Sequence, residues 1–162
     1  MRYVFSTTAT TRYRFPTHTN ELVMDRADAT TSESFVTVME PGEAPPLHKH
    51  DDTEQVFYVL SGRGRLHIGP DAEDKGPLEP GDLVRIPPGT WHRVPCVGDE
   101  PLRYLVVDCF PGGRPTHEPT WDSHVRVVCA ENGWDFDAVK RDEVTRDAVE
   151  RDEVTLDAGA DR

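Results

Sequence analysis

The chain has 162 residues, a formal net charge of −12 and hydrophobic residues at 36% of its positions. That length suits one domain that buries its own core. Because an acidic surface repels phosphate groups, we expect neither nucleic acid nor an anionic membrane as a partner. No apolar run is long enough for a membrane span, and the first residues lack the pattern of a signal peptide. We therefore expect a cytoplasmic protein.

The three cysteines are odd in number and far apart in the sequence. Cys96, Cys109 and Cys129 form no Cys-x-x-Cys pair, which favours reduced thiols over a disulfide framework. We expect Cys96 to be an inert buried thiol.

Residues 1–20 are rich in threonine and aromatic side chains. They are predicted to form an N-terminal arm, either as an edge strand or as a segment that packs on another subunit. A frayed end is the alternative for the first ten residues.

Short apolar runs separated by Gly and Pro follow from residue 21 onward. Such runs with few helical patterns between them are typical of an all-β barrel or sandwich, which we place at residues 21–130. The runs are 22–24, 35–39, 56–60, 65–68, 83–86 and 103–107.

Residues 131–162 have a different composition, with eleven acidic and five basic side chains. The sequence RDEVT occurs at 141–145 and again at 151–155, with valines every five residues, a period of neither helix nor strand. We interpret this segment as a solvated, mobile acidic extension with at most one short helix, around 134–140.

Four side chains suggest a metal site. Two histidines two residues apart on a strand point to the same side, so His48 and His50 can reach one ion. Gln55 can approach the same point from the next strand, and His92 follows a Pro-Pro-Gly turn. Three imidazoles and one oxygen can hold a divalent transition metal and leave positions open.

Glu54 is the alternative to Gln55 as the oxygen ligand. Gln55 shares a strand face with Phe57 and Val59. Glu54 lies on the opposite face, which continues as Val56, Tyr58 and Leu60. We prefer Gln55, and we then expect the opposite, apolar face to be covered in a homodimer.

These residues resemble the two motifs of the cupin family. Gly42-x5-His48-x-His50-x4-Gln55-x6-Gly62 is similar to the first motif, and Gly81-x5-Pro87-x-Gly89-x2-His92 to the second. The resemblance covers about residues 35–110 and implies a cupin double-stranded β-helix (jelly-roll) barrel with a metal in its interior. Gln55 stands where most cupins carry Glu, and Cys96 where the second motif usually ends in Asn.

The glutamine variant is similar to the cupin-type aromatic polyketide cyclases of actinobacterial antibiotic pathways, the resistomycin-cyclase-like group. That resemblance implies a small dimeric enzyme with zinc held by His48, His50, Gln55 and His92. The implied reaction is the intramolecular aldol-type cyclisation of a poly-β-ketone. Four neutral ligands leave the ion its full +2 charge, which favours Lewis-acid chemistry and weakens an oxygen-activating iron interpretation.

Phe57, beside Gln55 on its strand face, and Trp91, beside His92, are candidate substrate-binding residues. Trp91 either walls the pocket mouth or caps the barrel. The general base is not identified, and a metal-bound hydroxide and His67 are both candidates, although His67 is also typical of a solvated strand residue. His18, His117 and His124 lie in loop-like sequence and receive no role.

Two other classes of function remain open. One is a mononuclear iron dioxygenase, or an isomerase with nickel or manganese, in the same barrel. The other is a non-catalytic cupin that binds a small ligand. Metal analysis and oxygen consumption distinguish these classes.

Overall fold

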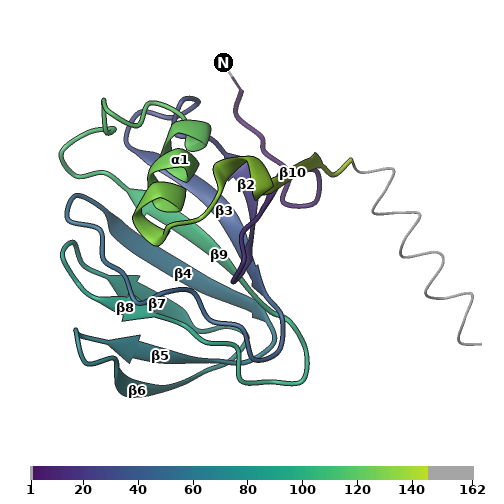
Figure 1. Cartoon of the computed structure of the whole chain (residues 1–162), viewed down its shortest axis with the longest axis vertical. Helices are drawn as coiled ribbons and strands as arrows, with labels where there is room; N and C mark the ends of the chain where they lie inside the picture. Colours follow the sequence, from purple (N-terminus) through teal and green to yellow (C-terminus); the bar gives the residue numbers. More distant parts are fainter. Residues whose placement is uncertain (1, 146–162) are drawn as a thin grey trace, which may run out of the picture.

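Ten strands in two sheets form the framework of the computed structural model, which describes residues 2–145 (Figure 1). The strands are β1 (Thr11–Arg14), β2 (Thr19–Met24), β3 (Ser32–Met39), β4 (Glu54–Ser61), β5 (Gly64–Ile68), β6 (Glu73–Leu78), β7 (Leu83–Ile86), β8 (His92–Arg93), β9 (Leu102–Cys109) and β10 (Lys140–Glu143). The helices are α1 (Trp121–Asn132) and the short 3-10 helix η1 (Phe136–Ala138).

The larger sheet has the strand order β10-β1-β2-β3-β9-β4-β7, and the smaller one β6-β5-β8. All pairings are antiparallel, and β9 inserts between β3 and β4. The chain therefore winds back between strands that are distant in sequence, as a double-stranded β-helix requires. The predicted all-β barrel is confirmed.

The six predicted apolar runs all fall within strands of the structure, in β2, β3, β4, β5, β7 and β9. The pattern missed β6 because its sequence, EDKGPL, is mostly exposed and contains Gly and Pro. It missed β8 because two residues cannot show an alternation.

Gly62 closes the turn between β4 and β5 with a φ of 76°. A Cβ atom at this position would lie 2.4 Å from the carbonyl oxygen of Pro101. Backbone conformation and space therefore both require glycine here. This turn fixes where β4 ends and so which of its residues face the interior.

Helix α1 was not predicted, although its end signals are present in the sequence. Thr120 caps its first turn through Ser123, and Gly133 ends it in the left-handed conformation. Trp121, Val125 and Cys129, four residues apart, are buried against the barrel. Figure 1 shows α1 lying across the larger sheet at one end of the barrel, where the Trp121 ring packs 4.6 Å from that of Phe35.

The structure differs from the expected mobile extension over residues 131–143. Here the chain completes α1, forms η1 and adds β10 to the outer side of β1. β1 is therefore not an edge strand, and η1 is the one short helix expected within 134–140. The remainder of the repeat, from residue 146, lies outside the described residues.

The outer face of β4 and β7 carries exposed apolar side chains, as predicted, beside the Glu54–Arg85 ion pair. Tyr58, Leu60 and Leu83 are 45%, 43% and 65% exposed, and Tyr58 is paired with Leu83 across the two strands. The N-terminal arm was expected to form an edge strand or to pack on another subunit. In the structure, Tyr13 and Phe15 are part of the chain's own core, and Tyr3 is exposed.

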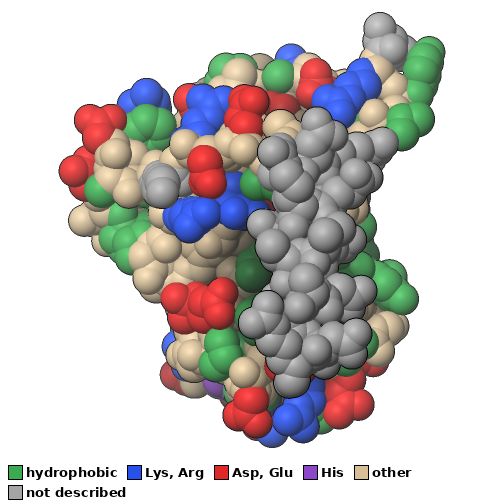
Figure 2. Space-filling view, turned by 90° about the vertical axis from the view of Figure 1, so that its right-hand side faces the viewer, with side chains coloured by type: hydrophobic (Ala, Val, Ile, Leu, Met, Phe, Trp, Pro, Cys, Tyr) green, Lys and Arg blue, Asp and Glu red, His purple; other side chains and the backbone are tan. Residues whose placement is uncertain are grey.

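Elsewhere the surface is strongly charged. Figure 2 shows acidic and basic side chains close to one another on the visible face. Arg12 and Arg103, for example, both pair with Glu21. No helix among residues 2–145 is long and apolar enough to cross a membrane. All three cysteines are free thiols, and Cys96 is buried.

Candidate metal centre

Backbone pairing brings the two histidine motifs together. The amide of His92 donates to the carbonyl of His48 at 2.8 Å, and the amide of His48 donates back at 3.2 Å. This isolated bridge joins the segment before β4 to the start of β8. Residues 44 positions apart in the sequence therefore become direct neighbours.

The side chains of His48, His50 and His92 converge next to this bridge. Their ligand atoms all lie within 4.8 Å of one another. Two of these histidines come from one short segment, and the third from the facing strand. A group of this kind can hold a divalent metal ion.

Two of the imidazoles are held in one tautomer. His48 Nδ1 lies 2.8 Å from the carbonyl oxygen of Pro46, and His92 Nδ1 lies 2.9 Å from that of Thr90. Since a carbonyl oxygen only accepts hydrogen bonds, each Nδ1 carries the proton. Each Nε2 therefore presents a lone pair, the form that a metal requires.

Gln55 adds an oxygen to this group. Its side chain is buried, and Oε1 lies 2.8 Å from His92 Nε2. With the proton of His92 on Nδ1, these two atoms face each other as acceptors, and a cation bound by both satisfies them. Glu54 instead forms an ion pair with Arg85. The face assignment of the sequence analysis is therefore consistent with the structure.

Burial keeps the site neutral. It lowers the pKa of His92 to about 4, and it lowers the pKa of His50 well below the usual value, as do the neighbouring histidines. Asp108 lies opposite Gln55 on β9, and burial beside Glu33 raises its pKa well above the usual range. Burial thus favours the uncharged forms of His50, His92 and Asp108.

The group opens into a cavity of about 470 Å³. Phe57 lines it, as predicted, and packs 5.1 Å from Tyr104, ring centre to ring centre. Trp91 is not among the lining residues; it is 37% exposed, and its ring centre lies 5.9 Å from the Lys49 ammonium. Of the two predicted substrate-binding residues, the structure therefore brings only Phe57 to the cavity.

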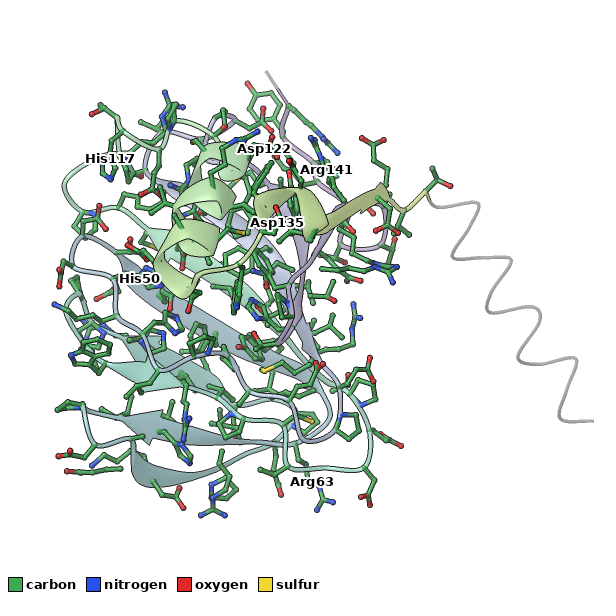
Figure 3. The ribbon with its side chains drawn as sticks, in the orientation of Figure 1. His50, Arg63, His117, Asp122, Asp135 and Arg141 are labelled. Carbon is green, nitrogen blue, oxygen red and sulfur yellow. The ribbon has the colours of Figure 1, made fainter. Side chains whose placement is uncertain are left out.

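A buried chain of charges lies beside the cavity. The Arg26 guanidinium donates to both carboxylate oxygens of Glu33 at 2.6 and 2.7 Å. It also contacts Glu118 at 3.2 Å, and Glu118 lies 2.6 Å from Nδ1 of His124. His124 comes from α1, and its ring lies 6.5 Å from that of His50, which Figure 3 shows beside this helix.

The sequence analysis missed the role of these residues in lining the cavity. His18, His124, Arg26 and Glu118 all line it, although they come from outside both motifs. The capping signals of α1 were the one local clue to the position of His124. His67, by contrast, is not a lining residue, and its Nδ1 accepts a hydrogen bond from Arg93 at 3.2 Å.

Comparison with known proteins agrees with this geometry. Residues 35–108 match the cupin domain family. An uncharacterised protein of Methanocaldococcus jannaschii is 34% identical over 89 residues, which are 55% of this chain and 64% of that protein. A glucose-6-phosphate isomerase of Pyrococcus horikoshii is 30% identical over 54% of this chain and 47% of its own length. The chain thus spans about half to two-thirds of these relatives.

Solved structures show the same fold. A Klebsiella pneumoniae protein with a double-stranded β-helix domain aligns with a TM-score of 0.58 at 23% identity, over 67% of this chain and 90% of that one. The winding of the sheets, the convergent histidines and the matched residues lead to one assignment. The described residues form a cupin-type double-stranded β-helix, and residues 35–108 match the cupin domain family.

Proposed function

We propose that the chain is a metal-dependent enzyme that removes a proton next to a carbonyl group, and that its reaction is the aldol-type cyclisation of a poly-β-ketone. The observation that carries this proposal is the neutral donor set of His48, His50, His92 and Gln55 at a partly aromatic cavity. A divalent ion held there, zinc in our proposal, would supply Lewis acidity toward a carbonyl oxygen. Fe²⁺, Ni²⁺ and Mn²⁺ suit the same donors.

The side chains that line the cavity give it a shape suited to such a substrate. Phe35, Phe57, Tyr104 and Trp121 give the cavity aromatic walls, which suit a flat, unsaturated carbon chain. Because the cyclisation is intramolecular, holding the chain folded supplies much of the rate. Walls of this kind also keep water away from an enolate.

Aldose–ketose isomerisation is the second candidate, because the relative from Pyrococcus horikoshii is a glucose-6-phosphate isomerase. That reaction also begins with removal of a proton next to a carbonyl. A sugar phosphate needs a cationic phosphate site, however. Arg26 and Lys49 are paired with carboxylates, which leaves Arg93 as the lining cation with no carboxylate partner in the described residues. Among the described residues, Arg93 is therefore the candidate contact for a phosphate group.

The test combines metal analysis with two activity assays. Protein expressed in medium with defined zinc, iron, nickel and manganese is analysed for bound metal, with oxygen uptake recorded alongside. Cyclisation is followed by mass spectrometry of a linear poly-β-ketone made by a polyketide synthase, and isomerisation by conversion of fructose 6-phosphate.

We expect one bound divalent ion and a cyclised product. His92→Ala should lose both, whereas His67→Ala, outside the cavity, serves as the matched control and should keep both. Oxygen-dependent turnover, isomerisation without cyclisation, or a metal-free wild type would overturn the proposal.

A further inference from the structure

His124 stands at the centre of a constellation that neither cupin motif contains. It lies in the first turn of α1 and lines the cavity. Its side chain is 18% exposed, so the cavity can reach it although most of its surface is packed. The His124 ring packs against the Trp121 ring, with the ring centres 5.3 Å apart.

The proton of His124 is fixed by its carboxylate partner. Nδ1 lies 2.6 Å from Oε2 of Glu118. A carboxylate at this distance accepts the Nδ1 proton, and Nε2 is left with a lone pair. The described part of the chain offers Nε2 no hydrogen-bond partner. A carboxylate that orients an imidazole in this way is the arrangement of a histidine that accepts protons.

Glu118 is itself held in place. Its Oε2 contacts the Arg26 guanidinium at 3.2 Å, and Arg26 is anchored by two hydrogen bonds to the fully buried Glu33. Arg26 also donates to the backbone carbonyl of Glu118. This anchoring fixes the loop before α1 and with it the approach of His124 to His50, at 6.5 Å between ring centres.

We propose that His124 accepts the proton removed from the carbon next to the substrate carbonyl. This inference rests on the proposed function. The C–H bond breaks, its electron pair forms the enolate, and the proton moves to Nε2 of His124. Glu118 stabilises the resulting imidazolium. The proton then returns to carbon, or to the hydroxyl group that leaves as water after the aldol step.

His124 lies apart from the three-histidine group, and the two have different roles in this proposal. His124 does not belong to the group whose ligand atoms lie within 4.8 Å of one another. A carbonyl group held near His50 would place its neighbouring carbon between the two imidazoles. His67, the base candidate from the sequence, does not line the cavity and is replaced by His124 in this proposal.

The experiment uses dihydroxyacetone as the probe, since it chelates metals and carries exchangeable protons next to its carbonyl. Hydrogen–deuterium exchange at these positions is followed by NMR in the full-length, zinc-loaded protein. The variant is His124→Asn, whose amide can still donate to Glu118 but offers no basic nitrogen. His67→Asn is the matched control, because His67 does not line the cavity.

We expect His124→Asn to slow exchange by about 100-fold or more, while zinc content and zinc affinity stay unchanged. His67→Asn should exchange like wild type. Exchange at the wild-type rate in His124→Asn would overturn this inference and leave the proposed function intact. A tenfold loss of zinc affinity would also overturn it, by making His124 a ligand. A zinc-loaded wild type with no exchange above the metal-free protein would instead contradict the proposed function.

An independent readout is the tautomer of His124. Long-range ¹H–¹⁵N spectra of the metal-free protein should show the proton on Nδ1. Glu118→Ala, which offers Nδ1 no acceptor, should remove this preference without loss of zinc binding. A proton found on Nε2 in the wild type would contradict the proposed role.

Discussion

Replacing Arg26 tests whether the buried charge chain supports the fold beside the site. Arg26 is 2% exposed, and its partner Glu33 is 0% exposed. Both oxygens of Glu33 bond the guanidinium, at 2.6 and 2.7 Å. Arg26→Met keeps an unbranched side chain but leaves the Glu33 carboxylate buried without a cation. Breaking a buried ion pair from one side costs about 3–5 kcal/mol.

That cost predicts a large thermal effect. In a protein of this size about 1 kcal/mol shifts Tm by roughly 2–4 °C, so Arg26→Met should melt about 6–20 °C below wild type. Urea and thermal denaturation should be measured with a chelator present, because bound metal would add its own stability. Glu33→Gln alone should also destabilise, since it removes the fully buried carboxylate that accepts two hydrogen bonds from Arg26 and leaves Glu118 as the partner of that charge.

The double variant decides the interpretation. If Arg26 and Glu33 act as one buried pair, removing both as Arg26→Met/Glu33→Leu should cost much less than the two single changes added together. We expect a coupling energy of about 2 kcal/mol or more. Additive losses, or a loss below about 1 kcal/mol in Arg26→Met, would refute the claim that this pair is desolvated and mutually dependent.

Three further predictions concern the metal centre and the assembly. Gln55→Glu should bind metal more tightly yet turn over more slowly, because the added charge attracts the ion and weakens its pull on substrate; equal or faster turnover would contradict this. Burial lowers the pKa of His92 to about 4, so the unfolded state binds more protons than the folded state below about pH 6.5. His92 alone should therefore lower the free energy of unfolding of the metal-free protein by roughly 3 kcal/mol as pH drops from about 6.5 to 4. A flat pH profile for wild type relative to His92→Gln would contradict this. We also propose a homodimer through the apolar face of Tyr58 and Leu83, so Leu83→Lys should give monomers in sedimentation; a monomeric wild type at micromolar concentration would reject it.

The sequence by itself determined the barrel and the group of three histidines in it. Two-residue alternation predicts which side of a strand each residue faces, and this rule separates Gln55 from Glu54 without knowledge of which strands pair. The positions of His48, His50 and His92 are also predicted from local signals, because turns with glycine and proline set where each strand begins. Each of these signals spans only a few residues, so it can be read from the chain alone.

Tertiary structure decided what surrounds that group. Arg26, Glu118 and His124 meet across 98 residues of sequence, and no local period links them. Their meeting depends on α1 packing over the larger sheet, a position set by the burial of Trp121 and Val125. The same holds for β10, whose charged sequence shows no strand pattern and forms a strand because β1 offers it a free edge. Contacts between distant segments arise from packing, and packing is a property of the whole folded chain.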